Sequence, residues 1–161
     1  MDRIAGNYEA SIASLVERIA QDQRIGRDAV EAVLGVKLDA KPVANGRPQE
    51  WALHGLFSQK DGFRIELHPA EAGLELAISN PLDDGKACYL HAARIRSLLV
   101  ETLGYKATEL GAGKRPYTLL TQNAPPMSSP VAVALFARKP SFTNNASPDC
   151  VYSLKLTAAG G

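Results

Sequence analysis

The chain has 161 residues, a hydrophobic fraction of 45% and a charged fraction of 22%, which is ordinary for one globular domain. Its 18 Lys and Arg nearly balance its 17 Asp and Glu, and a net charge of +1 does not support nucleic-acid binding, which usually shows a basic stripe. No apolar run approaches the length of a membrane span.

Two helices are predicted in the N-terminal part. The first carries an apolar stripe at helical spacing, formed by Tyr8, Ile12, Leu15 and Ile19. The second covers residues 28–34 and ends at Gly35, which suits a helix C-terminus. Residues 40–48 are rich in Pro, Gly and Asn and predict a loop between this helical part and the strands.

Three strands follow, at residues 51–57, 63–67 and 74–78, each with alternating apolar positions. The dipeptide Asp61-Gly62 predicts the turn between the first two strands. A three-residue loop at 60–62 would then place His54 directly opposite His68.

A helix is predicted over residues 86–103, because an apolar stripe recurs there at helical spacing. The stripe consists of Cys88, Ala92, Ile95, Leu99 and Leu103. Asp83 and Asp84 favour the positive N-terminus of this helix, and Gly104 suits its end.

The C-terminal part predicts three more strands, at residues 117–121, 131–138 and 150–157. The run 131–136 is apolar on both faces and predicts a central strand. In the last strand, alternation places Cys150, Tyr152, Leu154 and Leu156 on the core face.

These elements predict an α+β fold in a single domain over residues 1–161. The N-terminal helices occupy 1–38, and 49–157 hold a mainly antiparallel sheet of about six strands with one central helix packed on one face.

Cys88 and Cys150 both fall on predicted core faces, and we expect them to form a disulfide. The bond would close a loop of about 60 residues and indicates an oxidising compartment. Two buried free thiols are the alternative. The first residues lack the apolar segment of a signal peptide. Two alternatives are open: a cytoplasmic protein, or a periplasmic protein from which a signal peptide or lipoprotein anchor has been removed. The disulfide favours the periplasm.

The polar clusters give little evidence for a catalytic or metal-binding site. His54 and His68 would share the outer sheet face with Glu66 and Glu75, and a small hydrolase using His54, His68 and Glu66 is one alternative. Zinc needs at least one more ligand in a usual spacing, so we expect a solvated sheet surface without metal or cofactor.

The segment 111–115 resembles a phosphate-binding loop, but Thr108 and Arg115 stand where that motif needs a glycine and a hydroxyl. The element before it is predicted to be the end of a helix rather than a strand, and a turn is therefore predicted here.

Two long segments, 122–130 and 139–149, exceed the usual length of hairpin connections and are candidate binding loops. Met127 and Phe142 are apolar residues within them and are candidate anchors for a protein partner. Lys139, Asn144 and Asn145 would form the polar rim. In the alternative interpretation, both loops fold back on the edge of the core.

The chain is similar in plan to small envelope proteins that accompany proteobacterial secreted toxins as immunity proteins. The similarity rests on residues 30–38, 51–57, 88–99 and 150–156. It implies a non-enzymatic protein that occludes the active site of a toxin. A second resemblance, to cytosolic type III secretion chaperones, is weaker, because those proteins are usually acidic dimers that end in a helix.

Overall fold

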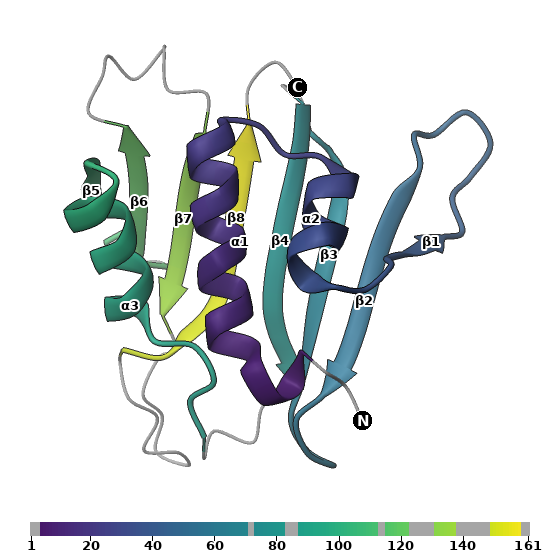
Figure 1. The fold of residues 1–161 in the computed structure, drawn as a ribbon, viewed down its shortest axis with the longest axis horizontal. Helices are drawn as coiled ribbons and strands as arrows, with labels where there is room; N and C mark the ends of the chain where they lie inside the picture. The colour runs from purple at the N-terminus through teal and green to yellow at the C-terminus, as the bar shows by residue number, and fades with distance from the viewer. Residues whose placement is uncertain are drawn as a thin grey trace.

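The computed structural model describes residues 4–70, 73–82, 87–112, 115–122, 131–137 and 149–158. These residues form one eight-stranded sheet and three α-helices (Figure 1), which confirms the predicted α+β class. The helices are α1 (Tyr8–Asp22), α2 (Arg27–Leu34) and α3 (Ala92–Ser97), with a 3₁₀ turn η1 (Ala5–Asn7) before α1 and a π-helical segment η2 (Leu98–Thr102) after α3. The strands are β1 (Asp39–Lys41), β2 (Glu50–Leu56), β3 (Gly62–Ala70), β4 (Gly73–Leu82), β5 (Tyr105–Leu110), β6 (Tyr117–Gln122), β7 (Val131–Ala137) and β8 (Val151–Ala158).

The sheet is built from two meanders. Its strand order is β1-β2-β3-β4-β8-β7-β6-β5, and all neighbouring strands are antiparallel. The first meander runs from β1 to β4. The crossover through α3 and η2 then leads to the far edge at β5, and the second meander returns to pair β8 with β4 (Figure 1).

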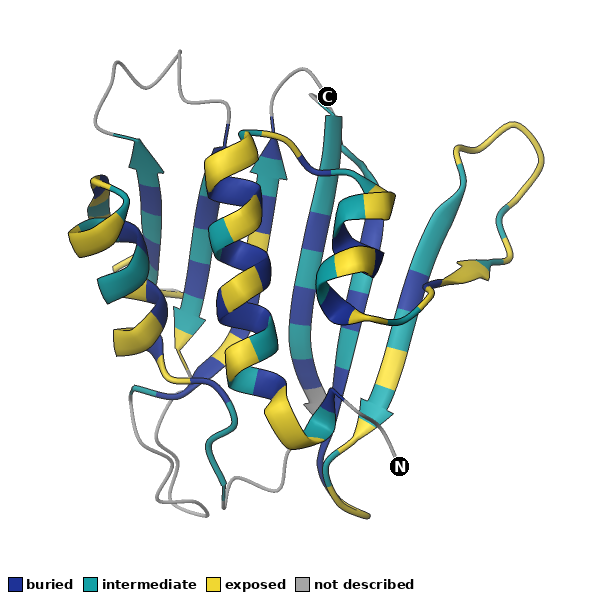
Figure 2. Cartoon of the chain, viewed as in Figure 1, coloured by how far each residue is buried: buried dark blue, intermediate teal, exposed yellow. Residues whose placement is uncertain are grey.

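The three helices cover one face of this sheet (Figure 1). Ile12, Leu15 and Ile19 of α1 are at most 1% exposed, and they share one apolar core with strand residues such as Leu76 and Leu156. Buried and more exposed residues alternate along the strands (Figure 2), because successive side chains point to opposite sides of a sheet. We call the opposite side, which no described helix covers, the helix-free face.

The N-terminal helices agree with the prediction from sequence. The predicted stripe of α1 is buried, and α2 ends at Gly35, which has a φ of +71°. Only glycine adopts this left-handed conformation without steric cost, which is why the helix stops there.

The prediction of about six strands was too low, because it missed β1 and β5. β1 has only three residues and lies at the start of the segment predicted as a loop. β5 is an edge strand in which Tyr105 alone is buried, so its residues lack a clear apolar alternation. β5 directly precedes Gly111, so a strand rather than the predicted helix end comes before this turn.

The β2–β3 hairpin has a different register from the predicted one. His54 pairs with Arg64 rather than with His68, and the connection spans residues 57–61. The reason is Asp61, which is 4% exposed and whose carbonyl oxygen accepts hydrogen bonds from the amides of Phe57 and Ser58 at 3.0 and 3.3 Å. Asp61 is thus an anchor of a wider loop rather than the tip of a tight turn.

The predicted helix over 86–103 begins later, at Ala92. The preceding residues pair with the start of β8, where His91 forms an isolated bridge with Cys150 and the Leu90 carbonyl accepts the Val151 amide at 2.8 Å. Cys88 therefore precedes the helix instead of lying in its first turn, and the predicted Asp83 and Asp84 lie outside the described residues. The middle of the stripe is confirmed, because Ala92, Ile95 and Leu99 are buried, while Leu103 is only partly buried and follows η2.

The last strand contains a bulge that the alternation did not predict. Phe136 pairs with Ser153 and Ala137 with Val151, which leaves Tyr152 as the extra residue. Tyr152 is consequently 37% exposed instead of buried, while Leu154 lies in the core as expected.

Ile95 and Leu99 are fully buried where α3 and η2 meet the core. We expect Ile95→Ala or Leu99→Ala to lower the free energy of unfolding by about 2 to 5 kcal/mol, because each change leaves a cavity. Leu56→Ala removes the same atoms from a side chain that is 58% exposed, and should cost less than about 1 kcal/mol. Urea denaturation measures the three values, and a cost below about 1 kcal/mol at both core positions would contradict the packing described.

Candidate functional site

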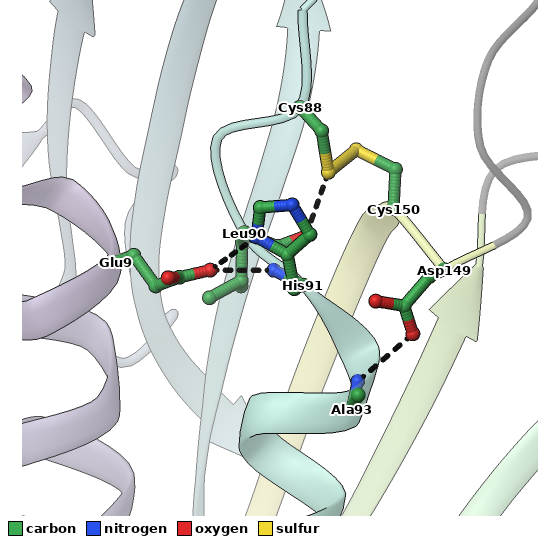
Figure 3. Close-up of a disulfide and its surroundings, with 7 residues drawn as sticks. All are labelled: Glu9, Cys88, Leu90, His91, Ala93, Asp149 and Cys150. Carbon is green, nitrogen blue, oxygen red and sulfur yellow. Dashed lines mark hydrogen bonds and ion pairs between the residues drawn. A yellow bond between two sulfur atoms is a disulfide. The ribbon is translucent and has the colours of Figure 1, made fainter.

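The predicted disulfide is present between Cys88 and Cys150, whose Cα atoms lie 5.5 Å apart (Figure 3). Cys88 lies in the segment before α3, and Cys150 lies immediately before β8 and is 1% exposed. The bond joins positions 62 residues apart and holds the crossover segment against the second meander. Both cysteines of the chain are used in this bond, so neither is a free nucleophile or metal ligand.

Polar contacts around the disulfide connect three elements (Figure 3). Glu9 of α1 accepts hydrogen bonds from the His91 amide at 2.8 Å, from His91 Nδ1 at 2.7 Å and from Arg94 at 3.1 Å. Asp149 accepts the Ala92 amide through its carbonyl oxygen at 2.6 Å and the Ala93 amide through its carboxylate at 3.0 Å. The start of α3 is therefore capped by Asp149, which lies just before β8, and is tied to α1 by Glu9.

The environment of Glu9 lowers its pKa. Partial burial acts in the opposite direction, but the hydrogen bonds from His91 and Arg94 favour the ionised carboxylate and outweigh it. Glu9 is thus an anion that joins α1 to the start of α3.

The predicted histidine cluster on the helix-free face does not converge. His54 stands opposite Arg64, whereas His68 pairs with Glu75 of β4, with 3.3 Å between His68 Nε2 and Glu75 Oε1. Within the described ranges, no group of three His, Cys, Asp or Glu side chains is placed to hold a metal ion.

Glu66 is held in its own ion-pair network, with Lys41 Nζ at 2.7 Å and Arg64 Nη1 at 3.8 Å. Burial would raise its pKa, but the hydrogen bond and charge of Lys41, together with the charge of Arg64, lower it. Because a general acid or base works best with a pKa near the working pH, this arrangement gives no support to proton transfer at Glu66.

A different cluster lies at the other end of the helix-free face. Tyr117 of β6 stacks on Phe136 of β7, with ring centroids 5.0 Å apart and an interplanar angle of 26°. Arg115 lies over the Phe136 ring with its Cζ 5.4 Å from the centroid, and Lys155 Nζ of β8 lies 6.0 Å from it. We call Arg115, Tyr117, Phe136 and Lys155 the aromatic–cationic patch.

Strand alternation places this patch on the helix-free face. Thr118, Leu135 and Leu154 are buried under the helices, so the residues next to them in the chain point to the other side. Arg115 and Lys155 are exposed, and both rings are half-buried. The rings therefore form a partly accessible apolar surface with positive charge on it.

The two cations of the patch differ from Arg27, the other described cation that lies over an aromatic ring. Arg27 also lies over an aromatic ring, that of Trp51 at 5.1 Å, but it has a carboxylate partner in Glu31 at 3.3 Å. Among the residues that the structure describes, neither Arg115 nor Lys155 has a carboxylate within ion-pair distance. The patch can therefore accept a negative charge from outside.

Sequence reasoning missed this patch. Arg115 was considered only as part of an incomplete phosphate loop, and Phe136 only as part of a buried strand. The sequence did contain one signal, because the run 131–136 is apolar on both faces. If only one face contacts the helices, the other must form an apolar surface on the opposite side of the sheet. The predicted partner contacts Met127, Lys139, Phe142, Asn144 and Asn145 lie outside the described residues.

Two hollows lie elsewhere on the surface, and neither is lined by a comparable set of aromatic and cationic residues. One, of about 410 Å³, lies at the end of α2 beside Glu31, which is already occupied by the Leu38 amide at 2.7 Å. The other, of about 240 Å³, lies between the 42–48 segment and Pro69 and is rich in proline.

A comparison with known protein families, with curated proteins and with solved structures finds no match to this chain. Among the described helices, none is long and apolar enough to cross a membrane.

The disulfide closes a long loop, so its removal should destabilise the fold strongly. For a sequence separation of 62 residues, the chain-entropy model gives about 4 kcal/mol for the double variant Cys88→Ser/Cys150→Ser. Urea denaturation of the variant and of the oxidised protein measures the difference, and adding a reductant should bring the unmodified protein to the stability of the variant. Two free thiols in the denatured, non-reduced protein would contradict the bond.

The lowered pKa of Glu9 has a consequence for acid stability. A carboxylate with a lower pKa in the folded than in the unfolded chain stabilises the fold above its unfolded pKa, and this is lost as the pH falls through the folded pKa. We expect Glu9→Gln to be less stable than the unmodified protein at about pH 7, and the gap to shrink between about pH 5 and pH 3. Denaturation at a series of pH values tests this. A stability difference between the two proteins that does not change with pH would show that it does not arise from the ionisation of Glu9.

Proposed function

We propose that this protein is a non-enzymatic protein-binding domain of the bacterial cell envelope, and that it works in the periplasm as an immunity protein that occludes the active site of a secreted toxin. The Cys88–Cys150 bond supports the compartment, because disulfides form and persist where the environment is oxidising.

The observation that carries the proposal is the aromatic–cationic patch on the helix-free face. Aromatic residues and Arg are enriched in protein–protein interfaces and in their energetic centres. Here they project from adjacent strands of an eight-stranded sheet. Little conformational freedom would be lost on binding, because the ring stacking and the cation–aromatic contacts already hold these side chains.

The two alternatives receive less support. A cytosolic secretion chaperone would keep its thiols free, whereas Cys88 and Cys150 are bonded. A small hydrolase would need His54 and His68 to face a common site, and they pair with different partners. The predicted anchors Met127 and Phe142 stay predictions.

The test is capture followed by neutralisation. The oxidised protein, immobilised and exposed to secreted and periplasmic fractions of its native host, should retain one toxin in a one-to-one complex. Adding the protein to that toxin should abolish the toxin's activity at equimolar concentration, because an occluded active site cannot reach its substrate. The double variant Arg115→Glu/Lys155→Glu should protect less well, and Lys60→Gln, an exposed cation on the β2–β3 hairpin, should protect fully.

Two results would contradict this function. One is a captured protein that is a cytosolic secretion substrate, which would favour a chaperone. The other is a captured protein whose activity is unchanged in the complex, since occlusion requires the loss of activity.

A further inference from the structure

The aromatic–cationic patch belongs to a longer row that crosses the second meander on the helix-free face. Leu110 of β5 pairs with Tyr117 of β6, and Phe136 of β7 pairs with Ser153 of β8. Since the Tyr117 and Phe136 rings stack, one side chain from each of four neighbouring strands lies in the row. Leu110 is 37% exposed, which extends the apolar surface to the edge of the sheet.

We propose that this row is the recognition site for an extended acidic segment of the partner protein, in which carboxylates and apolar side chains share one face. The proposal rests on the proposed protein-binding function and adds to it the place of contact and the chemistry of the partner.

The guanidinium of Arg115 is prepared for a carboxylate. A guanidinium that lies over an aromatic ring is held in one orientation while its in-plane N–H groups stay free for bidentate hydrogen bonds. Arg115 Cζ lies 5.4 Å from the centroid of the Phe136 ring, and Lys155 Nζ of β8 lies 6.0 Å from it. Because Phe136 contacts both cations, an acidic group that binds either one also approaches an apolar surface.

The size of the row suits a short stretch of extended chain. Four strands at a spacing of about 4.8 Å span about 14 Å, which an extended chain covers in about five residues. Ala134 is a small, half-buried residue directly opposite Lys155, whereas Ser153 is buried. A partner backbone can therefore approach the sheet closely next to Lys155.

Charge decides between this occupant and two others. Nucleic acid would require a basic stripe, but the helix-free face also carries Glu66 and Glu75, and the net charge is only +1. A second copy that docked by twofold symmetry would place the same patch against itself, so the Arg115 and Lys155 charges would repel. An acidic protein segment is the occupant that these charges favour.

The probe is a fluorescein-labelled peptide of about twelve residues built from Asp-Ser-Leu-Ser repeats, since alternate residues of an extended chain share a face. Its matched control replaces each Asp by Asn. Fluorescence anisotropy with the oxidised full-length protein should show binding of the Asp peptide that weakens with added salt, and at least about tenfold weaker binding of the Asn peptide.

Variants locate the binding. Arg115→Gln/Lys155→Gln should weaken binding of the Asp peptide at least about tenfold, and Phe136→Leu, which keeps an apolar side chain but removes the ring, should weaken it several-fold. Leu56→Ala and Lys60→Gln change an apolar residue and a cation that lie outside the row, and both should bind as the unmodified protein does. An unchanged melting temperature shows that each variant is folded.

Four results of the binding measurements would overturn the proposal. They are equal affinity for the Asn peptide, undiminished binding by Arg115→Gln/Lys155→Gln, no binding of the Asp peptide at about 1 mM, and preferential binding of an oligothymidine. Reversible dimerisation in sedimentation that the double variant abolishes would assign the row to a second copy instead.

The failure of this proposal is distinguishable from failure of the proposed function. If a captured toxin binds Arg115→Gln/Lys155→Gln as tightly as the unmodified protein, the row is not the contact site but the function stands. If the Asp peptide binds at the row while no toxin is captured, the site stands and the immunity function fails.

Discussion

The fold depends on the short extended segment before α3 and on its attachment to β8. Each of four consecutive residues there contacts a different part of the molecule: Cys88 bonds Cys150, Leu90 lies in the core, and His91 contacts Glu9 of α1. Tyr89 stacks on Phe57 with ring centroids 3.7 Å apart and donates to Asp61 at 2.7 Å, which joins the β2–β3 hairpin to the same segment. Because the covalent loop between the two cysteines contains β5, β6 and β7, one bond restricts most of the second meander.

This attachment also explains how the chain makes its long crossover. After β4 the chain must reach the opposite edge of the sheet, and a helix that started at Lys86 would have left its first turn without backbone partners on β8. Instead, Leu90 and His91 pair with Cys150 and Val151 as in a strand. The helix begins only at Ala92, and Asp149 accepts hydrogen bonds from the amides of Ala92 and Ala93. The crossover is thus fixed by hydrogen bonds at its start and by the burial of Ile95 and Leu99 along its length.

Local patterns in the sequence predicted the elements that carry strong periodicity, and long-range pairing is what they could not supply. The stripes of α1 and α3, the end of α2 at Gly35 and the core faces of β3 and β4 followed from the spacing of apolar residues. The register of the β2–β3 hairpin could not be predicted in this way. The observed register differs from the predicted one by four residues, an even shift that keeps every side chain on its predicted face. Only the burial of Asp61 distinguishes the observed register from the predicted one. The aromatic–cationic patch was unpredictable for a related reason, since Tyr117 and Phe136 meet only through the pairing of β6 with β7.

The two ends of the helix-free face differ in how their charges are satisfied, and this difference gives the surface a direction. On β3 and β4, Glu66 lies 2.7 Å from Lys41 Nζ and Glu75 lies 3.3 Å from His68 Nε2, so both carboxylates already have partners within the sheet. On the second meander, the described part of the chain gives Arg115 and Lys155 aromatic contacts but no carboxylate, so their charge is still available. Cations held on a rigid sheet can orient a partner before any apolar contact forms, because electrostatic attraction acts at longer range than packing. The patch therefore provides specificity through its position as much as through its composition.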